Sequence, residues 1–326
     1  MYYKEPEDKK PCKNSRRDIF LLLLFFFYGL TANAQQNTIR EKKYSFEFQL
    51  FANTNFNNET SQQLKFEYEI KRTLVVYKQQ LSRNINFCLA GDTYVKDQNK
   101  TYNRKPYLKR AYFQYNNHDL SFSAGLLVSE QFKYQRKIWQ LRYISKTFQN
   151  KFSYGENRNI GMILKHNLSS RFSYDLAITS GYYTPINNSS KKYQIMAGQT
   201  FKTNFCTFRL FNSIELHATH EHILSFFITK KINNGGFGLE AARKNNKNKL
   251  ADEDQYGFSI FGNHSFSKNT MCFARYDTNK ESVKSHATNI FWVGIQSSFK
   301  KHMNASLFYN NKDLDMHFYG LAVFIH

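Results

Sequence analysis

Apolar and polar residues alternate along most of the chain. From Tyr44 to Leu50 every second residue is apolar and the residues between are polar, and the stretch from Leu64 to Ile70 repeats the pattern. A period of two is that of a β-strand with one apolar face, whereas a helix would spread these residues around its circumference. The beginning of this region is therefore predicted to be β-structure.

The same alternation continues to the C-terminus and predicts sixteen strands. They lie near residues 43–56, 62–78, 83–96, 107–116, 119–128, 158–168, 171–181, 192–202, 205–217, 222–231, 236–244, 255–267, 269–279, 286–300, 302–310 and 315–326. Tight polar turns follow the even-numbered strands from the fourth to the fourteenth, and the links after odd-numbered strands are mostly longer, with short exceptions after the ninth and fifteenth. Transmembrane barrels have short turns at one end and long loops at the other, whereas a soluble β-sandwich, the alternative, has no reason for this arrangement. We therefore predict an all-β fold, a transmembrane antiparallel β-barrel of about sixteen strands.

The first 34 residues have the features of an export signal. Arg16 and Arg17 precede a twelve-residue apolar run from Ile19 to Leu30, and Ala32-Asn33-Ala34 supplies small residues for cleavage. A membrane anchor is the alternative, but a spanning helix needs roughly 20 apolar residues. We expect a signal peptide over 1–34, a barrel domain over 35–326, and a location in the outer membrane of a Gram-negative bacterium.

Composition adds two constraints. The chain has 22 Tyr and 32 Phe, yet its mean hydropathy is −0.63, which suits strands with one lipid-facing and one water-facing side. Its formal net charge is +21. In a soluble protein this charge would suggest nucleic acid, but in an exported barrel it favours passing anions or acidic lipopolysaccharide, so no nucleic-acid partner is expected.

The link from Ser129 to Asn157 is the longest in the chain and is rich in aromatic residues. Long loops in compact domains are usually functional or disordered, and this aromatic content argues against disorder. Apolar residues at helical intervals predict a short amphipathic helix that folds inwards and narrows the lumen: Tyr134, Ile138, Leu141, Phe148 and Phe152.

The same link carries a strong positive charge. Its acids are only Glu130 and Glu156. Rows of Lys and Arg select anions in pores, and the Arg fork suits phosphate oxygens. The candidate residues lining an anion path are Arg136, Lys137, Arg142, Lys146, Lys151 and Arg158. An exposed basic loop that binds lipopolysaccharide phosphates is the alternative.

Part of the chain resembles a known family. The segments Lys109–Tyr115 (KRAYFQY), Leu120–Leu126, Trp139–Asn150 (WQLRYISKTFQN), Asn159–Gly161 and Asp175–Gly181 are similar to the phosphate-selective porin family of the O and P type, in the form found in Bacteroidetes. The resemblance implies a sixteen-stranded homotrimeric barrel with a basic anion path.

The resemblance also implies that Arg142 and Lys146 face the channel. However, Asn150 and the pair Asn157-Arg158 stand where the family more often has acidic or small residues, so the charge of the constriction differs from the family's. With these departures, the resemblance implies a weak preference for anions rather than specificity for phosphate.

Other chemistry receives little support. His217, His220 and His222 could hold a metal, but they straddle a predicted turn where polar residues are expected anyway. No Gly-x-Ser-x-Gly or comparable signature of a hydrolase occurs. We therefore expect no enzyme activity, cofactor or metal. The predicted function is passive diffusion of small hydrophilic solutes, especially anions, and the alternative is a non-conducting structural or adhesive barrel.

Overall fold

The computed structural model describes residues 44–57, 65–95, 104–180, 193–216, 221–246, 254–299, 303–312 and 316–325. All sixteen predicted strands are present, with ends that differ from the predicted ones by a few residues at most. The predicted signal peptide, residues 1–34, lies outside the described residues.

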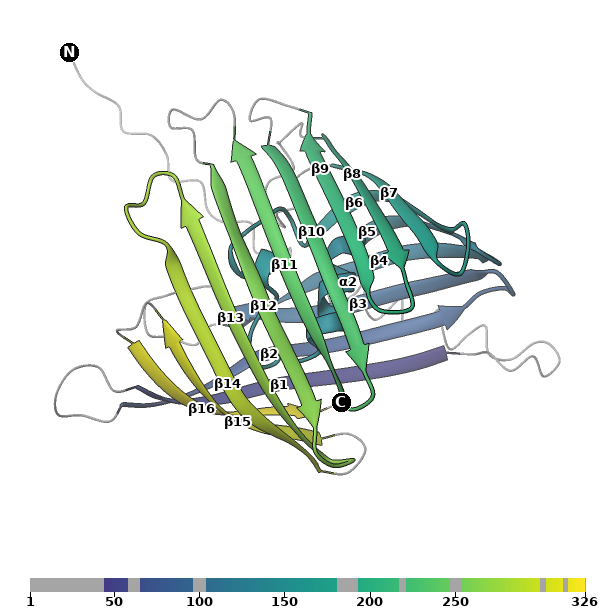
Figure 1. The fold of residues 1–326 in the computed structure, drawn as a ribbon. Helices are drawn as coiled ribbons and strands as arrows, with labels where there is room; N and C mark the ends of the chain where they lie inside the picture. The colour runs from purple at the N-terminus through teal and green to yellow at the C-terminus, as the bar shows by residue number, and fades with distance from the viewer. Residues whose placement is uncertain are drawn as a thin grey trace, which may run out of the picture. The chain divides into compact units, whose positions relative to one another are not determined.

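The strands follow one another in chain order (Figure 1). The first eight are β1 (Tyr44–Asn57), β2 (Lys65–Gln80), β3 (Ile85–Val95), β4 (Arg104–Asn117), β5 (Leu120–Val128), β6 (Arg158–Asn167), β7 (Phe172–Ser180) and β8 (Tyr193–Lys202). The other eight are β9 (Thr207–Glu215), β10 (Glu221–Ile232), β11 (Gly235–Asn246), β12 (Gln255–Ser265), β13 (Thr270–Glu281), β14 (Thr288–Phe299), β15 (Met303–Lys312) and β16 (Met316–Ile325).

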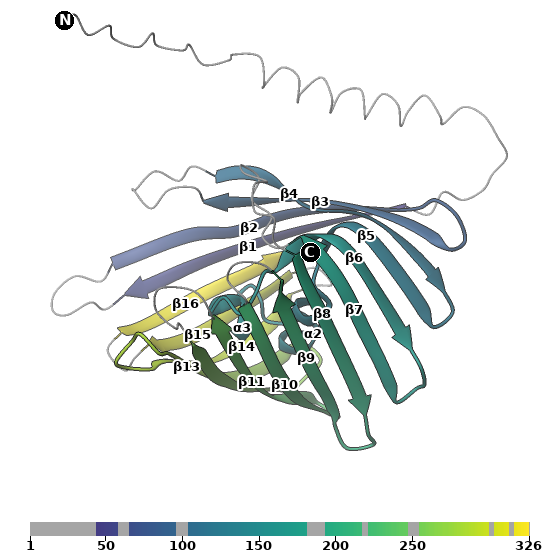
Figure 2. The ribbon, with the colours of Figure 1, turned by 90° about the horizontal axis from the view of Figure 1, so that it is seen from above.

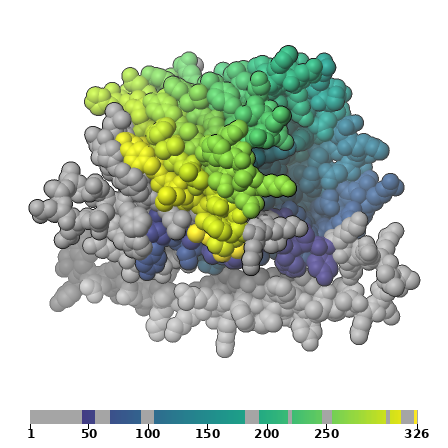
Figure 3. Space-filling model, turned by 60° about the horizontal axis from the view of Figure 1, so that its bottom comes forward, coloured from purple at the N-terminus to yellow at the C-terminus, as the bar shows by residue number. Residues whose placement is uncertain are grey.

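These strands form one closed antiparallel barrel. Each strand pairs with its neighbours in sequence, and β1 pairs with β16 from Leu50↔Ile325 to Asn57↔Phe318. The C-terminal strands, yellow in Figure 3, accordingly lie beside the purple β1. Closure pairs the backbone amides of every strand and leaves no sheet edge, which is what a β-structure inside a bilayer requires. The predicted fold class is confirmed.

Alternation gives the barrel an apolar outer face. On β10, Leu224 and Phe226 point outwards and are well exposed, whereas Ile223, Ser225 and Phe227 point inwards and are buried. The same alternation leaves Ile178 62% exposed and Leu307 68% exposed on other strands. Such residues would be unfavourable in water, but they match the lipid-facing belt of a transmembrane barrel. No helix in the described part of the chain is both long and apolar enough to cross a membrane.

Two short helices lie in the link between β5 and β6: α2 (Glu130–Trp139) and α3 (Phe148–Lys151). The single helix predicted from Tyr134 to Phe152 is therefore wrong in extent, and Leu141 lies in neither helix. Ser129 begins α2 by accepting a hydrogen bond from the Gln131 amide at 3.3 Å. Gln140, with φ 58°, ends the helix by turning the backbone into the left-handed region.

Candidate functional site: the lumen and its third loop

The third loop, residues 129–157, enters the barrel from the middle of the wall. Val128 and Arg158 are cross-strand partners, so β5 and β6 stay paired up to the point where the loop departs. β5 has only 9 residues, against 14 in the neighbouring β4. The loop therefore starts below the rim, and Figure 2 shows α2 and α3 inside the ring of strands. The predicted inward folding is confirmed.

The apolar side of the third loop packs on the far wall, formed by β7 to β16. Trp139 meets Phe261 and Phe273 edge to face, with ring centroids 5.6 and 6.3 Å away. Tyr143 stacks on Phe324 at 5.6 Å. These rings are as well packed as a protein core, so this part of the lumen is filled.

Polar contacts fix the same side of the loop. Tyr143 donates to Gln296 at 2.7 Å, and Tyr154 donates to Asn279 at 2.8 Å. Residues more than a hundred positions apart in the sequence are thus joined by hydrogen bonds that are partly or fully buried. Such bonds hold a loop in one position more firmly than apolar packing alone.

The near wall, formed by β2, β3 and β4, carries two adjacent pairs of cations. Arg72 pairs with Phe51 and Ile70 pairs with Ala52, so Lys71 has no partner on β1. In a regular strand one member of the pair Lys71–Arg72 would face lipid. The extra residue forms a β-bulge instead, and both side chains point inwards, Lys71 donating to the Ile144 carbonyl at 3.3 Å.

The same irregularity occurs on β4. Arg110 pairs with Ala90 and Leu108 pairs with Gly91, which leaves Lys109 without a partner on β3. Lys109 binds the carboxylate of Asp92 inside the barrel, while Arg110 lies close enough to the loop for its charge to act on Arg136 and Arg142. The two bulges together place four cations on the near wall, with Asp92 between Arg72 and Lys109.

Two arginines of the third loop face these cations. Arg136 donates to Asn157, and burial together with Arg142 lowers the pKa of Arg136 well below its usual value. Burial and the charge of Arg72 lower the pKa of Arg142 to about 9. Cations that lower one another's pKa repel one another, and a negative charge placed among them would offset this repulsion.

Several guanidinium nitrogens of this cluster are buried and have no hydrogen-bond partner in the described structure. They are Arg72 Nη2, Arg110 Nε, Arg136 Nε and Arg142 Nη1. Buried donors are nearly always satisfied in proteins, and an oxyanion is a ligand that several guanidinium groups can share.

Two cavities lie on either side of the third loop. The loop-side cavity, with a volume of about 800 Å³, lies between the third loop and the near wall. Its basic lining residues are Lys71, Arg72, Lys109, Arg142, Lys146, Lys151 and Arg158, and its acidic ones are Glu69, Asp92 and Glu156. Seven cations therefore face three acids, and the local charge is positive.

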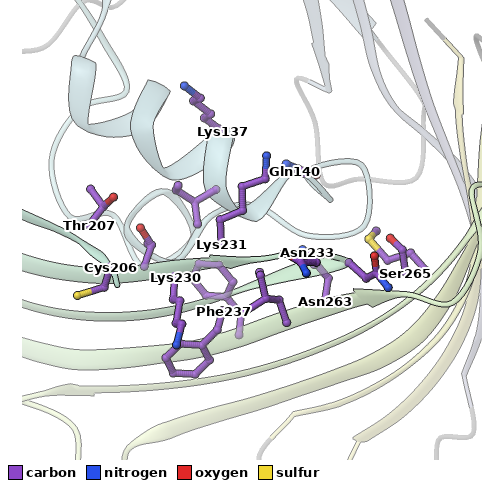
Figure 4. Close-up of a pocket in the computed structure, with 18 of the residues that line it drawn as sticks. Lys137, Gln140, Cys206, Thr207, Lys230, Lys231, Asn233, Phe237, Asn263 and Ser265 are labelled. Carbon is purple, nitrogen blue, oxygen red and sulfur yellow. The ribbon is translucent and has the colours of Figure 1, made fainter. Parts of the chain in front are cut away.

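The turn-side cavity has a volume of about 890 Å³ and lies at the mouth formed by the short turns (Figure 4). Lys137 and Gln140 at the end of α2 lie on one side of it, and β10, β11 and β12 with their turns lie on the other. Figure 4 shows Lys231 directed towards α2, with Lys230 and Phe237 on the opposite face of the strands.

The structure thus separates the six residues predicted to line an anion path. Arg142, Lys146, Lys151 and Arg158 line the loop-side cavity, Lys137 lines the turn-side cavity, and Arg136 lies among the buried arginines. The sequence reasoning missed the near-wall cations Lys71, Arg72, Lys109 and Arg110. An available signal was a pair of adjacent basic residues inside an otherwise alternating strand.

No metal centre is evident among the described residues, where no three His, Cys, Asp or Glu side chains gather as ligands would. His217 and His220 lie outside the described residues. His222 lies 3.0 Å from Asn212 Oδ1, a contact that satisfies one ring nitrogen without a metal.

No model of a protein family and no curated protein matches the sequence. Solved structures do match. A loop-deletion mutant of OmpT, an outer membrane protein of Vibrio cholerae, has a TM-score of 0.66 at 11% identity, over 87% of this chain and 99% of that one.

Two further structures show the same likeness. OmpF of Salmonella typhi, in complex with daunomycin, has a TM-score of 0.65 at 11% identity, over 87% of this chain and 97% of that one. The anion-selective porin from Comamonas acidovorans has a TM-score of 0.64 at 7% identity, over 87% and 99%. The fold of this chain is therefore the sixteen-stranded barrel of porins.

Proposed function

We propose that this chain is an outer-membrane porin of a Gram-negative bacterium, through which small hydrophilic solutes diffuse passively and anions pass preferentially. The observation that carries the proposal is the lining of the loop-side cavity, where seven cations face three acids. The apolar outer belt and the porin fold support the location and the transport class.

The selectivity follows from electrostatics. A narrow aqueous path with low-dielectric walls focuses the field of its lining charges, so an excess of cations raises the local concentration of anions. The porin of Comamonas acidovorans, described as anion-selective, has the same fold at 7% identity and sets a precedent only for the architecture.

We further propose that oxyanions, including phosphate, are favoured over halides. Arg72, Arg110, Arg136 and Arg142 each present a buried donor that has no partner among the described residues. Guanidinium groups bind carboxylate and phosphate oxygens through paired hydrogen bonds. An oxyanion at this point would also offset the mutual repulsion of the cations.

A non-conducting barrel is the second candidate, and one observation favours it. The loop-side and turn-side cavities share no lining residue, because the tip of the third loop lies between them. In this case the basic surfaces would bind lipopolysaccharide or a surface partner. The homotrimer implied by the family resemblance stays a prediction for either function.

Planar bilayers under a KCl gradient test both candidates. The porin proposal expects conductance and a reversal potential of the sign for chloride flow, with Arg142→Glu plus Lys146→Glu reducing or reversing the preference. Arg83→Glu plus Arg171→Glu is the matched control, since it reverses the same number of charges in exposed turns. Cation preference in the native protein would contradict the charge argument, and absent conductance would favour the second candidate.

Block of the chloride current by phosphate tests the oxyanion preference. Phosphate should reduce this current at lower concentrations in the native protein than in Arg110→Met. Equal sensitivity of the two proteins would remove support for binding at the arginine cluster.

A further inference from the structure

The far wall carries acids that point into the lumen. Asp175 on β7, Glu240 on β11 and Asp277 on β13 lie on the inward side of their strands and are 7%, 1% and 0% exposed. Charges at these positions would favour cations if water and ions reached them. Their burial beneath the third loop is therefore relevant to selectivity.

Two of these acids are paired with arginines that the loop also binds. Asp175 accepts from Arg209 at 2.8 Å, and Arg209 Nε donates to Gln131 of the loop at 2.8 Å. Gly198 lies against this ion pair, where a side chain of any size would overlap with both partners. The pair is thus enclosed by β8 on one side and by α2 on the other.

The second pair has the same arrangement. Asp277 accepts from Arg275 at 2.7 Å, and Arg275 Nη1 donates to the Lys146 carbonyl of the loop at 2.8 Å. The ring of Trp139 lies 4.8 Å from the same guanidinium group. The loop therefore covers this ion pair with a carbonyl group and an indole ring, neither of which is charged.

Glu240 is covered by a neutral group. Gln135 Nε2 of α2 donates to Glu240 Oε1 at 2.5 Å, and Gln135 is itself only 2% exposed. Arg142 and Lys146 of the loop line the loop-side cavity and lie towards the near wall instead, where their charges interact with those of Arg72 and Lys71. One side of the loop thus presents uncharged groups to the acids, while the other presents cations to the path.

We infer that the third loop determines selectivity partly as a screen, because it keeps the far-wall acids out of contact with permeating ions. This inference rests on the proposed function and concerns the same lumen. Glu240 should have no influence on selectivity while the loop is docked, and should oppose anion passage once the loop is removed. Gln131 and Gln135 are then positioning residues of the screen rather than residues of the ion path.

A loop deletion can test this because β5 and β6 remain paired at Val128 and Arg158. Replacement of residues 129–157 by a short Asn-Gly hairpin turn would join two strands that are already adjacent. The reversal potential would be measured in KCl gradients for the native protein, Glu240→Gln, the loop deletion, and the deletion combined with Glu240→Gln. Glu69→Gln is the matched control, since Glu69 lines the loop-side cavity.

In the native background, Glu240→Gln should leave the permeability ratio of chloride to potassium unchanged, whereas Glu69→Gln should raise it. In the loop deletion, Glu240→Gln should raise the ratio about two- to fourfold, because one unit charge across about 10 Å of water changes the local concentrations of anions and cations about twofold in opposite directions. An equal effect of Glu240→Gln in both backgrounds, or no effect in either, would overturn the screen. If the conducting native protein proves cation-selective, the proposed function fails separately.

Chemical labelling provides a readout that does not depend on conductance. A water-soluble carbodiimide with an amine nucleophile should modify Glu69 in the folded native protein but leave Asp175, Glu240 and Asp277 unmodified, as followed by mass spectrometry. All of these acids should react in the loop deletion. Ready modification of Glu240 in the native protein would refute the screen even if no channel activity were observed.

Discussion

Arg72 on β2 donates from Nε to Asp92 Oδ2 on β3 at 2.9 Å, and both side chains are almost completely buried. Asp92→Asn should remove the charge that compensates Arg72 and Lys109, so the ratio of chloride to potassium permeability should rise about two- to fourfold. The barrel should lose about 3 kcal/mol of unfolding free energy, because two buried cations lose their carboxylate. Bilayer recordings and urea unfolding in lipid vesicles measure the two effects. A fall in anion preference would contradict this assignment.

Arg110→Met should have the opposite combination of effects. Arg110 repels Arg136 and Arg142, and its Nε has no hydrogen-bond partner in the described structure. The substitution should reduce anion preference while leaving stability to urea unchanged or slightly higher. A large loss of stability would contradict this prediction, because it would show that favourable contacts of the Arg110 guanidinium group outweigh the repulsion.

Glu130→Gln should make the protein less stable at neutral pH, but not at low pH. Burial alone would raise the pKa of Glu130, but Lys133 at 2.5 Å and Lys165 at 3.8 Å outweigh it, and the pKa is lowered. The folded form therefore binds this proton less readily than the unfolded chain, and the stabilisation is complete above the ordinary carboxyl pKa. It is lost as the pH falls through the lowered pKa of the folded state. We expect a difference of about 1 kcal/mol near pH 7, which includes the effect of the helix dipole.

Unfolding curves of the two proteins, recorded from neutral pH down to about pH 2, check this prediction. The curves should converge in acid. A difference that persists at the lowest pH would mean that Glu130 stabilises the loop through packing rather than charge.

Trp139→Ala should release the third loop without unfolding the barrel. Trp139 is 2% exposed, lies between Phe261 and Phe273, and donates from Nε1 to the Ser145 carbonyl at 3.0 Å. Truncation of such a buried ring costs about 3–5 kcal/mol. Here the loss should weaken the binding of the loop to the barrel wall rather than the barrel itself. Conductance should increase, and protease should cleave between β5 and β6 while the strands resist. Trp139→Phe, which keeps most of the packing, should behave nearly like the native protein.

The strands could be predicted from the sequence because a barrel wall has lipid on one side and the lumen on the other. Every strand must then alternate, as β10 does with Leu224 and Phe226 outside and Ser225 and Phe227 inside. The inward fold of the third loop was predictable for a related reason, since its aromatic residues need a place to be buried.

The functions of the individual loop residues could not be predicted in this way. Gln135 covers Glu240, a residue 105 positions further along the chain, and no local pattern connects the two. The separation of Lys137 from Arg142 on opposite sides of the loop depends on Gln140, whose left-handed backbone ends α2. The inward-facing pairs Lys71–Arg72 and Lys109–Arg110 could not be predicted in this way either. Apolar and polar residues alternate normally on either side of each bulge, so a search over a few residues at a time does not detect the extra residue.

The bulges on β2 and β4 suggest how the charge of such a pore could change during evolution. Inserting one residue into a strand moves a neighbouring side chain from the bilayer face to the aqueous face without any substitution. A lineage could thus adjust which nutrients it admits through single-codon insertions and deletions in the wall, while its overall amino-acid content stays almost constant. Comparing the charge content of aligned sequences would overlook this kind of variation, whereas comparing strand lengths would reveal it.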